Sequence, residues 1–205
     1  MKIVCFMKYP RKGQVKTRLA KTVGESVALS LYRQMLDEVT AVLKSLSDDF
    51  SAELCYAGAN EAEMKESYDE FEIAEQIEGD LGEKLQARLA KHFNESDEAI
   101  CFIGSDCVDI DEALFAQSQE LFSLGKDLVI GPSDDGGYYL IALRRNYQYI
   151  FEGIDWSTER VFQQTIEKAI DHDLELAVLD QKIDLDTFEV LPKRWKEKFK
   201  EFING

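Results

Sequence analysis

The chain has 205 residues and a formal net charge of −16, from 24 Lys and Arg against 40 Asp and Glu. Hydrophobic residues make up 45% and Pro only 3 positions, so the chain can form a core and lacks the composition of a disordered protein. Strong acidity argues against binding to nucleic acid or to an anionic membrane, because both need a broad cationic surface. The longest uninterrupted apolar run, Tyr138 to Leu143, is too short to cross a bilayer, and Ile3 to Met7 is too short for a signal peptide. We therefore expect a cytoplasmic protein.

The charge is distributed unevenly along the chain. The first 24 residues carry +7 and no acidic side chain, so the remainder carries −23. A small anionic ligand is compatible with such a basic segment. The four cysteines and two histidines form no zinc or redox motif.

Short apolar runs alternate with segments of helical period, a pattern that predicts one α/β domain over residues 1–205. The short turn at 131–137 allows antiparallel pairing, so we expect a mostly parallel but mixed sheet within three α/β/α layers. Segment 60–78 is compatible with a short helix and strand or with an irregular excursion. The predicted strands are Lys2–Met7, Ala52–Ala57, Ala99–Gly104, Asp127–Gly131, Gly137–Leu143 and Leu174–Leu179. The predicted helices are Glu25–Leu46, Glu83–Phe93, Asp111–Leu124, Thr158–Asp171 and Leu191–Ile203, the last with Trp195, Phe199 and Phe202 on one face.

The loop after the first strand, KYPRKGQVKTRL, is the first candidate binding element. A basic, Gly-containing loop between a strand and a helix is typical of phosphate binding, because backbone N–H groups and cations converge at the strand end. Gly13 permits an unusual backbone conformation, Lys16 offers a point charge and Arg18 a bidentate fork. The alternative is an ordinary basic surface loop.

Acidic residues follow the apolar strand that ends in GSDCVD. Carboxylates at the carboxyl end of a buried strand suit Mg²⁺ or Mn²⁺, with Asp106 as the principal ligand. Asp109 is compatible either with metal ligation or with capping of the next helix.

Four further segments carry polar residues at expected strand or helix ends. GPSDDGGYYLIAL places Asp134, Asp135, Gly136 and Gly137 at a ligand, in a tight turn between two strands, or in both roles together. GDLGEKL either wraps a ligand with Gly79 and Gly82 or starts a helix. IDWSTE places Asp155 and Trp156 before a helix, and IDLDT places Asp184 and Asp186 after the last strand.

Six motifs in this order resemble one bacterial family. The blocks P-x-x-G-x-V-K-T-R-L, GDLGEKL, GSDC-x-D, GP-x-x-DGGYYLI, I-x-WST and D-x-DT are similar to those of DUF2064, or arsenosugar-biosynthesis-type, glycosyltransferases. These have the glycosyltransferase A-type fold of the nucleotide-diphospho-sugar transferase superfamily. Val108 departs from the family pattern, which usually has Pro there, and this puts the local loop geometry in doubt.

The resemblance implies transfer of a sugar from a nucleoside diphosphate sugar to a small-molecule acceptor, with Mg²⁺ or Mn²⁺. By position, it implies phosphate contacts from the first loop and GDLGEKL, metal ligation by the GSDCVD carboxylates, and a base at Asp135 or Asp155 if configuration is inverted. The residues assigned to phosphate are Lys8, Gly13, Lys16, Arg18, Gly79 and Gly82; those assigned to metal are Asp106 and Asp109. Those assigned to the sugar or acceptor are Asp134, Gly136, Gly137 and Trp156.

Two other functions fit the same residues. A nucleotidyltransferase, which joins a nucleoside triphosphate to a phosphorylated acceptor, needs similar cations for its phosphates. A phosphate-binding loop indicates that an anion binds but does not indicate which reaction follows. A non-catalytic nucleotide-binding protein is the third. The sequence decides neither the sugar, base and acceptor nor the oligomeric state.

Overall fold

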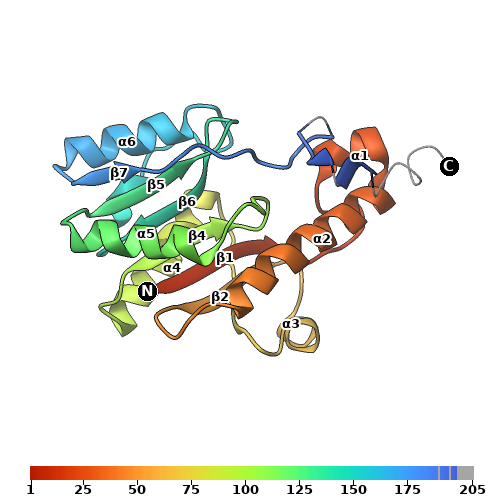
Figure 1. The fold of residues 1–205 in the computed structure, drawn as a ribbon, viewed down its shortest axis with the longest axis horizontal. Helices are drawn as coiled ribbons and strands as arrows, with labels where there is room; N and C mark the ends of the chain where they lie inside the picture. Colours follow the sequence, from red (N-terminus) through yellow and green to blue (C-terminus); the bar gives the residue numbers. More distant parts are fainter. Residues whose placement is uncertain (189, 194, 198–205) are drawn as a thin grey trace.

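The computed structural model describes residues 1–188, 190–193 and 195–197 of the chain. Strands and helices alternate along most of it, ending with the strand β7 (Figure 1). The strands are β1 (Lys2–Lys8), β2 (Ser51–Ala57), β3 (Glu72–Glu75), β4 (Ile100–Gly104), β5 (Leu128–Pro132), β6 (Tyr138–Leu143) and β7 (Leu176–Val178). The helices are α1 (Thr17–Val23), α2 (Glu25–Lys44), α3 (Glu61–Ser67), α4 (Leu81–Glu95), α5 (Glu112–Ser123) and α6 (Val161–Asp171), with a 3₁₀ turn η1 (Gln148–Phe151).

The described strands form one sheet in the order β3-β2-β1-β4-β6-β5-β7. Strand β6 runs antiparallel to both β4 and β5, and the other pairs are parallel. This confirms the expected mixed, mostly parallel sheet. Parallel pairing aligns the carboxyl ends of β1, β2 and β4 at one edge, where ligands of such sheets bind.

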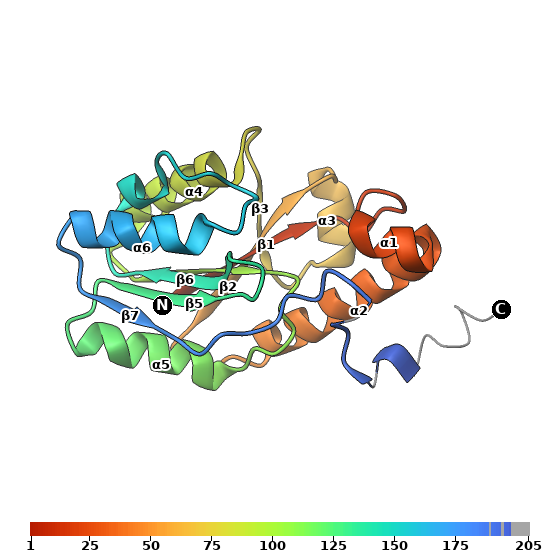
Figure 2. The same ribbon diagram turned by 90° about the horizontal axis from the view of Figure 1, so that it is seen from above.

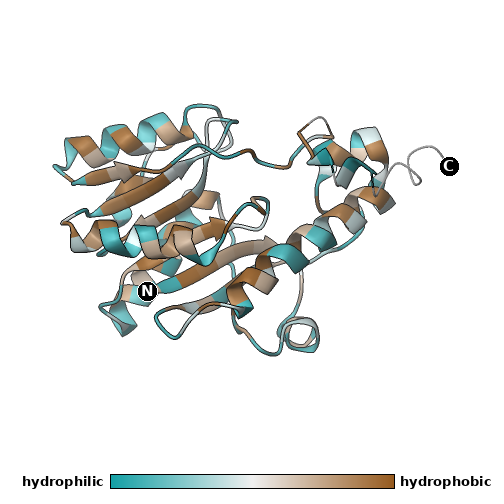
Figure 3. Cartoon of the chain, in the orientation of Figure 1, coloured by the Kyte–Doolittle hydropathy of each residue, from teal (hydrophilic) through white to brown (hydrophobic). Residues whose placement is uncertain are grey.

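Helices cover both faces of the sheet (Figure 2). One face carries α4, α6 and η1, whose apolar residues pack with Val4, Phe102 and Ile141. The other face carries α2 and α5, packed on Ile3, Cys5 and their neighbours. Figure 3 shows the hydrophobic residues gathered on the central strands and on the inner sides of the helices. The three-layer α/β/α arrangement is thus built because central strands are apolar on both faces.

Several boundaries differ from the sequence prediction. Helix α1 was not predicted, and segment 60–78 contains both a helix and a strand, α3 and β3. Helix α6 begins at Val161 and not at Thr158, because Ser157 adopts a left-handed backbone with φ 64°. Residues 156–160, which include Ser157, form turns and a bend before the helix.

The chain after β7 returns across the molecule to the α1–α2 end (Figures 1 and 2). Leu185, Leu191 and Trp195 are buried there and belong to the α2-side core, so this segment is packed against the body of the protein. The predicted helix face continues to Phe199 and Phe202, which lie outside the described residues. Among the described residues, we find no helix long and apolar enough to cross a membrane.

Candidate nucleotide site

A cavity of about 390 Å³ opens at the carboxyl ends of β1 and β4. Four of the residues predicted from sequence line it: Lys8, Lys16, Arg18 and Asp106. Further lining side chains that were not predicted include Gln14, Thr17, Tyr32, Gln76, Lys84 and Ser105. The cavity therefore brings the basic loop together with Asp106, the residue expected to be the principal metal ligand.

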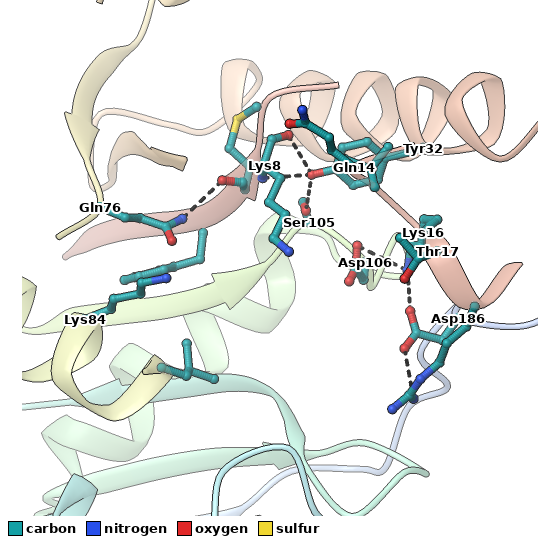
Figure 4. Close-up of a pocket in the computed structure, with 15 residues that line it drawn as sticks. Lys8, Gln14, Lys16, Thr17, Tyr32, Gln76, Lys84, Ser105, Asp106 and Asp186 are labelled. Atoms are coloured by element: carbon teal, nitrogen blue, oxygen red, sulfur yellow. Dashed lines mark hydrogen bonds and ion pairs between the residues drawn. The ribbon is translucent and has the colours of Figure 1, made fainter. Parts of the chain in front are cut away.

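Lys16 lies at the centre of the charged groups (Figure 4). Its backbone is left-handed, with φ 47° and ψ 47°, and its side chain is only 3% exposed. Its Nζ lies 2.7 Å from Asp186 Oδ1 and 3.2 Å from Asp106 Oδ1. Burial alone would lower the pKa of Lys16, but Asp106 and Asp186 outweigh it and raise that pKa. Lys16 is therefore a buried counterion of two carboxylates in this structure.

Asp184 joins this acidic group from the same C-terminal segment as Asp186. Burial and the nearby Asp106 raise the pKa of Asp184 to about 7, with smaller contributions from Asp186 and Asp135 and an opposing one from Lys16. Carboxylates distant in sequence thus share one small region, a pattern typical of cation or catalytic sites. The sequence motif IDLDT contained both residues, but only the fold shows that they meet Lys16.

The β5–β6 turn holds the C-terminal segment in place. Asp134 Oδ1 accepts a hydrogen bond from Asp184 N at 3.0 Å, and Asp134 N donates to the Lys182 carbonyl at 3.1 Å. Asp135 Oδ1 accepts from Ser133 Oγ and from Gly137 N. The alternative interpretation of this motif as a tight turn is confirmed. Through these bonds the turn positions Asp184 and Asp186 beside Lys16.

Gly136 has a specific steric role in the same turn. Its φ is 86°, and a Cβ at this position would lie 2.2 Å from the Glu159 carbonyl oxygen. Gly137 also lies against Asp135 and Ser133. Neither glycine, and neither Asp134 nor Asp135, lines the cavity. Their assignment to the sugar, to the acceptor or to proton transfer stays a prediction.

Tyr32 of α2 ties together the ends of β1 and β4. Its hydroxyl accepts from Lys8 N at 3.0 Å, donates to Lys8 O at 2.9 Å and lies 3.1 Å from Ser105 Oγ. Because Tyr32 is 3% exposed, this network is fixed inside the protein. It sets the position of Lys8 and of the residue that precedes Asp106.

The cations around the cavity differ in how they are paired. Arg18 is 70% exposed and lies 3.6 Å from Asp186, whereas neither Lys8 nor Lys84 forms an ion pair with a described residue. In Figure 4, Lys16 is turned toward Asp106 and Asp186, while Lys84 lies on the opposite side of the cavity. Lys8, Arg18 and Lys84 are thus the cations most open to an anionic ligand. Lys84 was quoted in GDLGEKL but was not assigned a role there.

The GDLGEKL motif starts a helix, as its structural alternative proposed. Asp80 Oδ1 accepts from Glu83 N, and Glu83 Oε2 accepts from Asp80 N, which forms a capping box for α4. Gly79, with φ 130°, lies directly beside Glu83, and Gly82 lies against the Trp156 indole. Neither glycine lines the cavity, so their contact with phosphate stays a prediction.

Four other predicted residues lie away from the cavity. Asp109 has a side chain that is 94% exposed and is 3.7 Å from Lys182 Nζ. Asp155 is bound by Arg160 at 2.7 Å and by Gln164 at 2.8 Å, and Trp156 packs near Phe151. Gly13, at φ 77°, shapes the first loop without lining the cavity. Arg11 of that loop contacts Glu63 at 2.5 Å and so is directed to α3.

The carboxylates of Asp106 and Asp186 are suitable ligands for a hard cation, but both are already paired with Lys16. Among the residues that the structure describes, no group of three or more His, Cys, Asp or Glu is placed to hold a metal ion. Asp106 and Asp186 nevertheless hold one positively charged atom, Lys16 Nζ, between them. Carboxylate oxygens are the ligands that Mg²⁺ and Mn²⁺ prefer. A metal here would need further oxygen ligands from outside the protein.

Comparison with solved structures shows that the fold is that of nucleotide-diphospho-sugar transferases and nucleotidyltransferases. A Desulfovibrio desulfuricans G20 protein, provisionally described as a nucleotide-diphospho-sugar transferase, matches with a TM-score of 0.85 and 28% identity, covering 99% of this chain and 96% of that one. The T. maritima inositol-1-phosphate CTP transferase matches with a TM-score of 0.61 and 13% identity over 100% and 96% of the two chains. CMP:2-keto-3-deoxy-manno-octonic acid synthetase, complexed with CTP, gives 0.57 and 11% over 97% and 98%.

The chain belongs to the DUF2064 family, described as an uncharacterized protein conserved in bacteria, whose model matches residues 41–158. The matched region includes Asp106 and the β5–β6 turn but not the loop after β1. A search of curated proteins gave no match. The expected membership of DUF2064 is thus confirmed, whereas the arsenosugar-biosynthesis and glycosyltransferase parts of that expectation stay predictions.

Proposed function

We propose that this protein is a metal-dependent transferase that uses a nucleoside diphosphate sugar as donor. The observation that carries the proposal is the single cavity in which exposed cations of the basic loop face Asp106 and Asp186. A diphosphate needs cations for its oxygens, and its metal needs carboxylates, so one ligand satisfies both halves of the site. The Desulfovibrio protein, similar over nearly its whole length, supports the choice of donor.

In this proposal Lys8, Arg18 and Lys84 bind the phosphate oxygens. Asp106 and Asp186 hold Mg²⁺ or Mn²⁺, which when bound neutralises charge developing on the leaving nucleoside diphosphate. Lys16 keeps the two carboxylates neutralised and close together in the absence of metal, because its Nζ contacts both. Asp135 is the candidate base if configuration inverts, because it lies in the β5–β6 turn in which the neighbouring Asp134 accepts a hydrogen bond from Asp184 N. Asp155 is a weaker candidate, because Arg160 and Gln164 already bind it.

Nucleotidyl transfer is the second candidate. Lys8, Arg18 and Lys84 are three cations open to one cavity beside the paired Lys16, and such a group also suits the greater charge of a triphosphate. The two reactions release different products, since glycosyl transfer frees a nucleoside diphosphate and nucleotidyl transfer frees pyrophosphate. The arsenosugar connection, the single-domain organisation and the cytoplasmic location stay predictions.

The test compares two aspartates of the same loop. Nucleotide binding with Mn²⁺ is measured by calorimetry for the wild type, Asp106→Asn and the matched control Asp109→Asn, whose side chain is 94% exposed. We expect at least a tenfold loss of affinity for Asp106→Asn and none for Asp109→Asn. Equal affinities in all three would remove Asp106 from the metal site.

A thermal-shift panel of nucleoside diphosphate sugars and nucleoside triphosphates identifies the donor class. A ligand that binds only the folded state raises the melting temperature by mass action. Stabilisation by triphosphates alone, followed by pyrophosphate release, would favour nucleotidyl transfer. Nucleotide binding without turnover of any donor would favour the non-catalytic alternative.

A further inference from the structure

A second cavity, also of about 390 Å³, lies between β3 and α4 beside the first. Gln76 and Lys84 line both cavities and so form the partition between them. The Gln76 amide is held firmly, because its Nε2 donates to the carbonyls of Met7 at 3.1 Å and Cys55 at 2.9 Å. The two cavities are therefore neighbours with a fixed shared wall.

One stripe of α4 supplies three cations to the second cavity. Lys84, Arg88 and Lys91 are spaced by four and three residues, which places them on the same helix face. Lys84 and Lys91 form no ion pair with any residue in the described ranges. Two carboxylates also line the cavity, but Glu61 is paired with Lys65, which leaves Glu75. Arg88 is itself paired with Glu53, so the unpaired charges are those of Lys84 and Lys91 against Glu75, and positive charge still exceeds negative charge in this space.

A second, independent feature of this cavity is the buried guanidinium of Arg88. Its side chain is only 8% exposed, and its Nε donates to Glu53 Oε1 at 2.5 Å while Nη2 donates to Oε2. This pairing occupies one edge of the guanidinium. The remaining nitrogen, Nη1, is buried and has no hydrogen-bond partner among the described residues. Buried polar groups are normally hydrogen-bonded, so Nη1 leaves Arg88 with a donor that its pair with Glu53 does not use.

We propose that this second cavity binds a phosphate group of a small molecule, with Lys84, Arg88 and Lys91 as its cations. A guanidinium matches phosphate oxygens in geometry, and two lysines add charge without fixed direction. Apolar residues such as Ile73 and Ile77 form other parts of the wall and suit the carbon portion of such a ligand. The phosphate belongs either to the nucleotide of the first cavity, reached past Lys84, or to a separate ligand. The proposal does not depend on which transfer reaction occurs.

The test uses inorganic phosphate and a nucleoside diphosphate as probes of the full chain. Lys91→Gln alters the second cavity alone, Lys8→Gln alters the first alone, and Lys126→Gln is a matched control outside both. We expect Lys91→Gln to weaken phosphate binding at least fivefold while Lys126→Gln leaves it unchanged. Both variants keep the fold, because Lys91 and Lys126 lie near the surface; substitution of buried Arg88 is avoided for this reason.

Two results would overturn the proposal. One is equal phosphate affinity in the wild type and Lys91→Gln; the other is loss of phosphate binding in Lys8→Gln but not in Lys91→Gln. Within a positive result, a parallel loss of nucleoside diphosphate affinity in Lys91→Gln assigns the phosphate to the nucleotide, and an unchanged affinity assigns it to a separate ligand. Failure of the nucleotide proposal is distinguishable, because Asp106→Asn and Lys8→Gln would then leave nucleotide affinity unchanged.

Discussion

Lys16 Nζ lies 2.7 Å from Asp186 Oδ1, joining two residues that are 170 positions apart in the chain. The lysine is almost completely buried, whereas Asp186 and Asp106 are 34% and 38% exposed. The ion pairs are therefore protected on one side and open to the cavity on the other. The cavity side of the two carboxylates is therefore open to a second cation, which would take the place of Lys16 Nζ.

Replacing this lysine should change metal affinity and stability in opposite directions. In Lys16→Met, two carboxylates lose their counterion, so the free energy of unfolding should fall by about 1–2 kcal/mol, less than for a fully buried pair because both carboxylates reach solvent. Added Mg²⁺ or Mn²⁺ should then stabilise the variant more than the wild type. Chemical denaturation with and without metal measures both effects. Equal metal-induced stabilisation would show that Asp106 and Asp186 do not bind the ion.

The buried pair of Glu53 and Arg88 should contribute strongly to stability. Burial would raise the pKa of Glu53, but Arg88 and Lys2 outweigh it and hold that pKa below its usual value. Glu53→Ala leaves a buried guanidinium unpaired, so we expect a loss of about 3–5 kcal/mol. Glu72→Ala is the matched control, since Glu72 also contacts Lys2 but is 65% exposed, and it should cost below about 1 kcal/mol. Urea denaturation of both variants decides; similar losses would contradict the prediction.

Gly82 should not tolerate even one added methyl group. A Cβ there would lie 2.4 Å from Trp156 Nε1 and 2.7 Å from Cε2, so the indole must move. We expect Gly82→Ala to destabilise the protein by about 1–3 kcal/mol, as overpacking does. It should also change the fluorescence of Trp156, while fully buried Trp195 provides a constant background. Gly104→Ala, whose added Cβ would meet nothing closer than 3.9 Å, is the control. Unchanged fluorescence in Gly82→Ala would contradict this packing.

His92 should make stability fall on mild acidification. It is 3% exposed and Nε2 lies 2.8 Å from the Glu98 carbonyl; burial lowers its pKa below the ordinary value of 6.5, and the nearby Arg88 adds to this. The folded state thus favours neutral His92, while the unfolded chain takes up a proton as pH falls through 6.5. The stability that neutral His92 contributes above pH 6.5 is therefore lost progressively as the pH falls from 6.5 to the folded-state pKa.

Melting temperatures between pH 7.5 and 5.5 measure this effect. Asp184, whose pKa is raised to about 7, opposes this effect as the pH falls, so the expected result is a difference between variants. On acidification His92→Gln should lose less stability, or gain more, than the wild type, and His172→Gln, at an exposed position, should behave like the wild type. If all three proteins show the same slope, a group other than His92 is responsible.

The sequence predicted elements well where local pattern decides them. Apolar strands such as Ile100–Gly104 and the stripe of α2 follow from hydrophobic periodicity. Helix α1 was not predicted because it has only seven residues and follows Lys16, which has a left-handed backbone and forms ion pairs with residues distant in sequence. Local propensity carries no signal for such a conformation.

The site was predicted in part for the same reason. Lys8, Arg18 and Asp106 were found because they follow strands in recognisable loops. Lys84 was not expected at the cavity, because a charged residue in a helix is ordinarily a solvated surface residue. Asp109 and Asp106 are three residues apart yet lie in different surroundings, a distinction that spacing alone does not make. Asp186 was identified as a polar residue after a strand, but its contact with Lys16 exists only in the folded chain.

The segment after β7 returns to α1 (Figure 1) and supplies Asp186 to the cavity. The cavity is therefore complete only when this late part of the chain is in place. A ribosome delivers the basic loop first and Asp186 more than a hundred residues later, after the strands of the sheet have been synthesised. A shortened chain ending before 184 would retain those strands but leave Lys16 facing Asp106 alone. The complete set of charges around Lys16 therefore requires the basic loop and the segment around Asp186 to have met.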